Sequence, residues 1–349
     1  MNWIKGFEAS YYMTIVDRNT FEDLERIEIT DASVNVSDSD LIESASVGCV
    51  AYDRGEQWIR LWLDARQDGS QPEHVSMFTG IATSPTESIN GVVRQSKLEC
   101  YSVLKPADEI PLQRGWYAPK GGNGTQIIKE LLKTTPAPTV IDDGNSYTLS
   151  QNIIAENNES HLSMVSKILK AINWRIKIDG NGTIHVAPKP KDIIASFDPL
   201  ENDAVQTRLD VTSDLYKCPN VFQAFIGDAS AIARDEDINS PISIPNRHRE
   251  VWKTEDNCDL NDGETLLQYA QRRLKEEQSV AMSVSYIRRF IPDVKVGDYI
   301  RLHYPEQGVD GMFAIKSQSF NLSYGSQVTE TAEKISDEAK YTQTTLDIS

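Results

Sequence analysis

A glycine-rich segment is the first place in this sequence where residue types and spacing could support ligand chemistry. Residues 120–125 read Lys-Gly-Gly-Asn-Gly-Thr, and a segment with helical apolar spacing, 126–133, follows directly. Free backbone N–H groups at the start of a helix can bind a phosphate group. A P-loop ends in Gly-Lys-Ser or Gly-Lys-Thr and follows an apolar strand, and neither feature is present. We therefore interpret the segment as a flexible loop that leads into a helix.

Two acidic segments raise the question of calcium binding. They span residues 179–183 and 256–264. Neither has the spacing of an EF-hand loop, in which a glycine occupies the sixth position. The first favours a hairpin turn, and the second is suited to cap a helix that begins near Glu264. Four scattered cysteines and five scattered histidines form no CxxC motif or Cys/His cluster, which argues against zinc and against a disulfide framework.

Catalytic motifs are equally hard to find. The sequence has no Gly-x-Ser-x-Gly segment and no Cys/His pair in a recognisable local context. A glycosidase needs two carboxylates at a defined separation across a cleft, which a sequence does not show. We expect no enzymatic activity, no cofactor, and no catalytic, cofactor-binding or metal-binding residue.

Four aromatic residues keep an alternative function open. Trp58, Trp62, Trp116 and Tyr117 occur in a chain rich in carboxylates, as in a carbohydrate-active or cell-wall-binding protein built on a β-scaffold. The competing interpretation is that these side chains pack between domains, because large aromatic side chains dominate interfaces. We favour the second interpretation.

Length, composition and charge narrow the class of protein. The chain has 349 residues, which suggests two or three domains. It carries 35 Lys and Arg against 52 Asp and Glu, a formal net charge of −17. This charge argues against a protein that binds nucleic acid or anionic lipid, since either would need a positive surface. The sequence shows neither an apolar run long enough to span a membrane nor the apolar region of a secretory signal.

The elements that would position any site are mostly strands. Alternating and β-branched segments predict strands in the first hundred residues at 8–16, 26–36, 56–64, 73–81 and 92–104. The absence of a long helix among them suggests a small barrel or sandwich.

The middle of the chain has a different character. Apolar residues at helical spacing predict helices at 126–133 and 160–172. The second helix leads directly into a predicted hairpin, with strands at 174–178 and 183–186 around an Asp-Gly-Asn-Gly turn.

The last third is again rich in predicted strands. One helix is expected at 264–278, with Leu267, Ala270 and Leu274 as its buried stripe. The strands are expected at 220–226, 280–288, 299–304, 312–317 and 319–324.

Several short segments, weak individually, occur in an order that carries a family resemblance. They include a Phe-Thr-Gly-Ile segment, the helix that ends in a hairpin, and a Gly-Asp turn followed by a Gly-x-Phe-x-Ile strand. The segments lie at 78–81, 97–102, 153–157, 172–182, 292–300 and 311–317. In this order they resemble the baseplate hub proteins of contractile phage tails, which include T-even and Mu-type hubs and hub homologues from prophages of Gram-positive bacteria.

The resemblance implies a β-rich α+β fold with two small tube-forming β-barrel domains joined by an α/β middle domain. The expected division is an N-terminal barrel at 1–105, a middle domain at 106–195, and a second barrel at 196–335 with an inserted or flanking helix at 264–278. A polar tail follows at 336–349. No segment resembles a peptidase or a receptor-binding region, which favours a purely structural hub.

The function implied by the resemblance is a trimeric, pseudo-sixfold ring that joins the tail tube to the central spike. The expected partners are two further copies of the chain, the tube or distal tube protein, the spike, other baseplate proteins and the tape measure protein. The expected location is the baseplate of a virion or of a DNA-free, tailocin-like particle, after synthesis in the bacterial cytoplasm. DNA would only pass through, and three copies would carry three times −17, or −51, formal charges, which would repel its phosphates.

Two structural expectations follow from such a ring. A trimer continues a sixfold tube only if each chain presents two equivalent units about 60° apart, so the N-terminal and C-terminal β-regions should be similar. The helix at 264–278 should lie outside the ring or between units, with Leu267, Ala270 and Leu274 at an interface.

Overall fold

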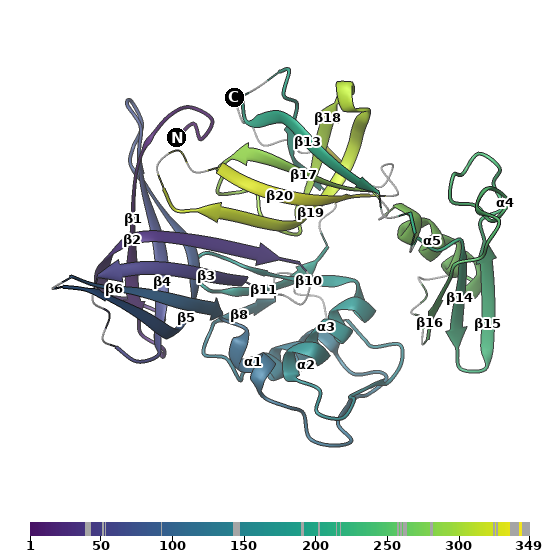
Figure 1. Cartoon of the computed structure of the whole chain (residues 1–349). Coiled ribbons are helices and arrows are strands. Elements are labelled where there is room, and N and C mark those ends of the chain that lie inside the picture. The colour runs from purple at the N-terminus through teal and green to yellow at the C-terminus, as the bar shows by residue number, and fades with distance from the viewer. Residues whose placement is uncertain are drawn as a thin grey trace.

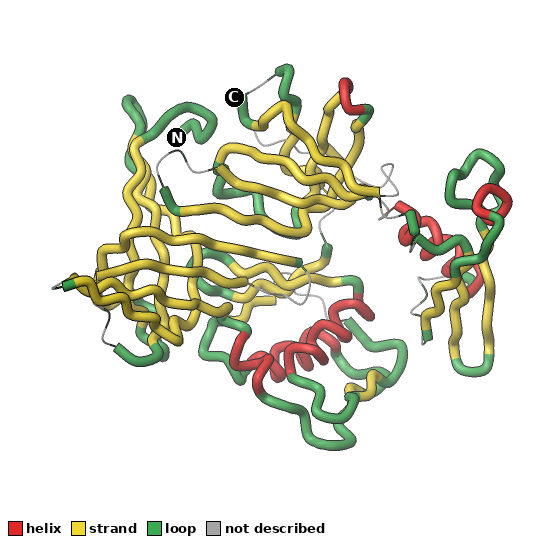
Figure 2. Tube along the Cα trace, viewed as in Figure 1, coloured by secondary structure: helices red, strands yellow, loops and turns green. Residues whose placement is uncertain are grey.

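β-Strands dominate the structure, and the chain is β-rich α+β (Figures 1 and 2). Two β-regions lie next to each other, helices lie along one side of them, and a small β-unit stands apart. None of the helices in the described ranges is long and apolar enough to cross a membrane. The computed structural model describes residues 1–38, 43–50, 52, 54–91, 93–141, 147–189, 192–201, 203–213, 215–216, 218–256, 258, 260, 264–279, 282–323, 325, 327–335 and 342–343.

The N-terminal β-region is a cycle of six paired strands. Neighbours follow the order β2-β3-β6-β5-β4-β1, and β1 also pairs with β2, so the hydrogen-bond pattern returns to its start. All six strands contribute inward side chains to one apolar cluster, as alternation along each strand requires. The strands are β1 (Glu8–Val16), β2 (Asp23–Ser37), β3 (Glu43–Val50), β4 (Gln57–Arg66), β5 (Glu73–Asn90) and β6 (Val93–Ser102).

The C-terminal β-region repeats this strand order. Its six main strands pair in the order β13-β17-β20-β19-β18-β12. If the strands of each region are counted along the chain, both orders read second, third, sixth, fifth, fourth, first. All six strands again share one apolar cluster. The strands are β12 (Asp192–Phe197), β13 (Val205–Ser213), β17 (Met282–Arg289), β18 (Tyr299–Tyr304), β19 (Val309–Asn321) and β20 (Gln327–Lys334).

The expected similarity of the two β-regions is therefore confirmed at the level of strand order. Two differences concern the first strand of each region. β12 runs parallel to β18, whereas β1 runs antiparallel to β4. Among the described residues β12 pairs with β18 and with β21 (Thr342–Gln343) but not with β13.

A separate unit is inserted between β13 and β17. It contains a three-stranded sheet in the order β15-β14-β16, covered by α5. The prediction that the strand at 220–226 belongs to the second barrel is wrong, because that strand forms a local hairpin with β15 and adds β16 on its other side. The elements are β14 (Val221–Ile226), β15 (Ala229–Arg234), α4 (Ile244–Arg247), β16 (Trp252–Glu255) and α5 (Leu266–Ser279).

The expected stripe of α5 is only partly buried. Ala270 and Leu274 lie in the apolar cluster of the inserted unit, against Phe222 of β14, whereas Leu267 is 47% exposed. Tyr269 takes the buried position instead. At 3.6 residues per turn, positions 266, 269, 270 and 274 form one face towards the sheet. Leu267 lies at the edge of that face, in the first turn of α5.

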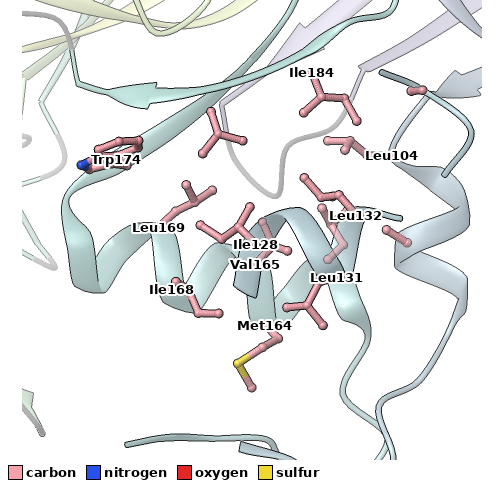
Figure 3. Packing of buried hydrophobic residues seen from close by; sticks show 14 of the residues in the cluster. Leu104, Ile128, Leu131, Leu132, Met164, Val165, Ile168, Leu169, Trp174 and Ile184 are labelled. Carbon is pink, nitrogen blue, oxygen red and sulfur yellow. The ribbon is translucent and has the colours of Figure 1, made fainter. Parts of the chain in front are cut away.

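The middle region packs two helices against a small sheet (Figure 3). Ser160 caps α3 by accepting a hydrogen bond from the Ser163 backbone N–H at 3.1 Å, and Asn173 ends the helix in the left-handed conformation. The elements are α1 (Lys105–Glu109), β7 (Tyr117–Ala118), α2 (Gly124–Leu132), β8 (Thr139–Ile141), β9 (Ile153–Ile154), α3 (His161–Ile172), β10 (Trp174–Ile178) and β11 (Ile184–Pro188).

Two further expectations need correction. The boundary at residue 195 falls inside β12, which pairs with β18 and so belongs to the C-terminal sheet. The two strands expected at 312–317 and 319–324 are one strand, β19, which begins at Val309 and ends at Asn321. The tail at 336–349 lies outside the described residues except for 342–343.

We predict that Leu274→Asp unfolds the inserted unit while the two β-regions stay folded. The substitution places a carboxylate in an apolar cluster, at a cost of roughly 3 kcal/mol or more. Hydrogen exchange should show lost protection only within the inserted unit, in α5, β14, β15 and β16. Leu267→Asp is the matched control and should leave protection unchanged, since that side chain is 47% exposed. Loss of protection throughout the chain would contradict the prediction.

Candidate functional site

The features that fix the two β-regions to each other form the candidate functional site, which we call the junction. It consists of the paired segments of β2 and β19 and of the hairpin β10–β11, which contacts both regions.

The strand β19 belongs to both sheets. Its first half pairs with β18, and its last five residues pair with β2, from Ser317 opposite Ser37 to Asn321 opposite Ser33. β20 follows the other edge of β19 from Phe313 to Phe320. The sheet is therefore continuous from one region into the next (Figure 1).

Side chains reinforce this pairing. Phe320 is 8% exposed because it packs in the apolar cluster of the N-terminal region. The Lys316 ammonium lies 2.9 Å from the Asp38 carboxylate, and so joins the same two segments. The two β-regions thus share apolar core as well as backbone hydrogen bonds.

A buried polar network holds β19 against its neighbours. The Arg288 guanidinium on β17 and the Glu330 carboxylate on β20 are 2.6 Å apart and essentially unexposed. The Gln318 amide on β19 donates to the same carboxylate at 2.6 Å, and the Tyr286 hydroxyl donates to its other oxygen. Burial, followed by the Glu330 charge, raises the pKa of Tyr286, so the hydroxyl keeps its proton. A shift in register would leave a buried charge without its partners.

Arg60 attaches the tip of the β10–β11 hairpin to the N-terminal region. Nη1 of its buried guanidinium donates to both carboxylate oxygens of Asp23 at 3.0 Å, and Nε donates to the Thr79 hydroxyl at 3.0 Å. Nη2 donates to the carbonyls of Phe21 and Asn181, both at 3.0 Å. The Arg60 side chain on β4 therefore donates hydrogen bonds to the hairpin turn of the middle region and to the N-terminal region at the same time.

Two glycines allow the hairpin tip to approach β5 this closely. A Cβ on Gly180 would lie 1.9 Å from the carbonyl oxygen of Ser76, which no side chain could tolerate. Gly182 has a φ of +86°, and a Cβ there would lie 2.8 Å from Thr79. The Thr79 hydroxyl donates to the Gly180 carbonyl at 2.6 Å. The Asp-Gly-Asn-Gly segment is thus a hairpin turn that docks on a strand.

The strand β10 attaches the same hairpin to the C-terminal region. Asp298 is 2% exposed and lies 3.2 Å from the Arg175 guanidinium and 3.3 Å from the Lys177 ammonium. Arg175 also donates to the Gly297 carbonyl. Burial and the nearby Lys177 charge lower the pKa of Lys295, whose backbone N–H donates to Asp298 at 3.0 Å. The strand β10 therefore docks on the Gly-Asp turn that was noted in the sequence.

A cavity of about 400 Å³ lies where the hairpin and the two β-regions meet. Its wall is mixed, with apolar rings beside charged groups. Burial raises the pKa of Glu43 to about 7, although Lys295 opposes the shift. The lining includes Trp3, Glu43, Met77, Lys177, Phe290 and Phe320.

The glycine-rich loop leads into α2, as expected from the sequence, and its residue Asn123 caps that helix. The Asn123 side chain accepts from the Gln126 backbone N–H at 3.2 Å, and the Gly124 N–H donates to the Tyr147 carbonyl at 2.7 Å. These donors are already used within the chain and do not point to a phosphate ligand. Within the described ranges, no group of three or more His, Cys, Asp or Glu side chains could hold a metal ion.

The four aromatic residues of the alternative hypothesis do not form one surface. Trp58 and Trp116 pack against the apolar cluster of the middle region. Trp62 donates from its indole to the Thr14 hydroxyl at 3.1 Å, and Tyr117 is 53% exposed. The expected packing between domains is confirmed for Trp58, which lies on β4 of the N-terminal region and packs against the apolar cluster of the middle region.

The expected interface residues lie away from the junction. Ala270 and Leu274 are covered by their own unit, and an intersubunit contact remains a prediction for Leu267 alone. Sequence reasoning did not identify the contacts of Arg60, Arg175 and Asp298. A cation between apolar residues, as in Trp58-Ile59-Arg60-Leu61-Trp62, was a usable signal for Arg60, because such a residue is buried only when it has partners.

The fold is that of phage tail proteins, although no family model and no curated protein matches the sequence. A tail protein from Neisseria meningitidis MC58 is similar, with a TM-score of 0.68 and 14% identity over 97% of this chain and 100% of that one. The 43 kDa tail protein of prophage MuSo2 from Shewanella oneidensis has a TM-score of 0.64 and 12% identity over 93% and 98%.

A third similar structure comes from a secretion system. The E. coli c3393 protein, a type VI secretion component described as similar to T4 tail proteins gp27 and gp5, has a TM-score of 0.50 and 11% identity. The match covers 90% of this chain and 76% of that one. At such identities the likeness concerns the fold.

We predict that Gly180→Ala loosens the junction. The added methyl group meets the Ser76 carbonyl, so the hairpin tip must move off β5, and overpacking of this kind costs roughly 1–3 kcal/mol. The urea midpoint should fall accordingly. Gly55→Ala is the control, because a Cβ there meets nothing within 4 Å, and it should change stability by less than about 0.5 kcal/mol. Equal effects of the two substitutions would contradict the docking role.

We also predict a pH dependence at the cavity. A carboxyl group whose folded pKa is about 7 favours the folded state when protonated, so it makes the wild-type chain lose stability as pH rises from about 4.5 to 7. Glu43→Gln should therefore be more stable than wild type at pH 8 and equal to it near pH 5. Thermal unfolding at both pH values tests this, with the exposed Glu87→Gln as control. A constant difference at both pH values would contradict it.

Proposed function

We propose that the chain is a structural hub of the baseplate in a phage tail or phage-tail-like particle. The observation that carries this proposal is the repeated strand order of two β-regions held in one fixed arrangement by the junction. In the proposed assembly, three chains form a ring with six similar β-units, and the ring joins the tail tube to the central spike.

Symmetry explains why such a chain would carry two β-units. A closed threefold ring has three equivalent positions, whereas a tube with sixfold symmetry presents six. Two similar units per chain supply six positions if the angle between the units is fixed. We propose that both units are tube-forming barrels, one within about 1–105 and the other built from 192–213 and 282–335. The middle region that joins them would set the angle through the β10–β11 hairpin.

The comparisons support a role in a phage tail or a related injection system. Two of the similar chains are tail proteins matched over nearly their whole length, and the third belongs to a type VI secretion system. The proposed partners are accordingly two further copies of this chain, a tube or distal tube protein, a spike, other baseplate proteins and a tape measure protein. The proposed location is the tail baseplate.

The charge of the chain suits a conduit for DNA. At −17 per chain, an acidic channel would repel phosphates and leave passing DNA unbound, in contrast to proteins that neutralise phosphates with Lys and Arg. We propose no enzymatic activity. The carbohydrate-binding alternative has weaker support, since two of its four aromatic residues pack inside the molecule.

We predict that the chain assembles as a trimer with a central channel. Sedimentation equilibrium of the purified chain should show a species of three times 39.1 kDa. Electron microscopy of assembled tail tips should show threefold symmetry at the spike side and six similar units at the tube side. A single chain at the centre of the particle, or a ring without a channel, would refute the hub.

A further inference from the structure

The fifth strands of the two β-regions correspond in detail. β5 pairs with β4 as far as Ala82, and its pairing with β6 then shifts between Thr83 and Thr86. β19 pairs with β18 as far as Ala314, and its pairing with β20 shifts between Ile315 and Ser317. Each fifth strand thus leaves its fourth-strand neighbour and bulges at the same place, so that Thr86–Asn90 corresponds to Ser317–Asn321.

The two corresponding segments differ in what lies at their free edge. Ser317–Asn321 is paired with β2. Thr86–Asn90 pairs with β6 alone among the described strands. Phe320 is 8% exposed at the junction, whereas Ile89, its counterpart in the alignment of the two strands, is 62% exposed. The N-terminal region therefore presents an open edge where the C-terminal region has a partner.

The counterpart of β2 is equally open. β2 is the second strand of its region, and β13 is the second strand of the other. The C-terminal end of β2 pairs with β19, whereas β13 pairs with β17 alone among the described strands. Towards the end of β13, Asp210 and Thr212 are exposed and Val211 is 42% exposed. Long open edges of this kind attract another strand unless something covers them.

We propose that the edge of β5 at Thr86–Asn90 pairs antiparallel with the end of β13, Asp210–Ser213, in a second copy of the chain. This contact repeats between chains what β19 and β2 do within one chain. This inference rests on the proposed trimer and identifies the contact between its chains, which we call the seam. Repeating one contact alternately within and between chains lets a head-to-tail interface close into a ring, and Ile89 becomes covered there as Phe320 is at the junction.

Disulfide trapping tests the seam directly. Ser88→Cys combined with Val211→Cys should form reducible species of two and three chains under mild oxidation. The native cysteines Cys49, Cys100, Cys218 and Cys258 are buried, so background should be low. Ser88→Cys alone, and Ser88→Cys with Ser230→Cys in the exposed part of β15, should give no such species.

A charge at the edge provides a second readout. Ile89→Lys should weaken trimer formation by about tenfold or more in sedimentation equilibrium. The melting temperature of the monomeric chain, measured at high dilution, should stay unchanged, because association itself stabilises the folded state. Ile154→Lys is the matched control, because Ile154 is 67% exposed on β9, and it should assemble normally. A fall in the melting temperature of the monomeric chain with Ile89→Lys would mean that the residue serves the fold of its own chain and would contradict the proposed contact.

The outcomes separate the seam from the hub. If trimers form normally, yet the double variant Ser88→Cys, Val211→Cys gives no disulfide between chains and Ile89→Lys is tolerated, the seam is overturned and the hub still stands. A chain that stays single and uncrosslinked at every concentration tested would overturn both. Crosslinked trimers that the Ile89→Lys substitution weakens would establish the seam.

Discussion

The fixed relation between the two β-regions depends on one strand that serves two sheets. A strand has two edges, and β19 divides one of them between β18 and β2 while β20 occupies the other. Rotating either β-region about the other would break this ladder and expose buried backbone groups, which is costly. This shared strand therefore restricts how the two regions can be placed relative to each other, and the other contacts of the junction restrict the arrangement further.

Buried charge adds specificity to this backbone constraint. Arg60 and Arg288 are both nearly unexposed, and each is matched by a carboxylate and by carbonyl or amide groups. Such pairs contribute little net stability compared with apolar packing, because desolvation offsets their attraction. Their geometry is demanding, however, and a misplaced strand or hairpin would leave a charge unpaired. We interpret both as devices that permit one register and one docking position.

The sequence predicted local structure better than long-range pairing. The α3 helix and the hairpin after it were predictable, since Ser160, Asn173 and the Asp-Gly-Asn-Gly turn act on their immediate neighbours. The strand β3 was missed, because Ser, Ala and Gly make up much of it and give little β-signal. The assignment of β14 failed because an alternating strand does not state which sheet it joins. The junction was invisible for the same reason, as its contacts join Arg60 to Asn181 and Arg175 to Asp298.

The inserted unit leaves and rejoins the C-terminal sheet at a single point. Ser213 and Met282, which flank it, lie opposite each other on β13 and β17, and its apolar cluster contains no residue of that sheet. A short turn between Ser213 and Met282 would fit the C-terminal sheet as well as the whole inserted unit does. Either connection returns the chain to the same place on the sheet. The position between these strands is therefore a natural site for exchange of modules, at which a lineage could gain, lose or replace an accessory without altering the wall that carries it.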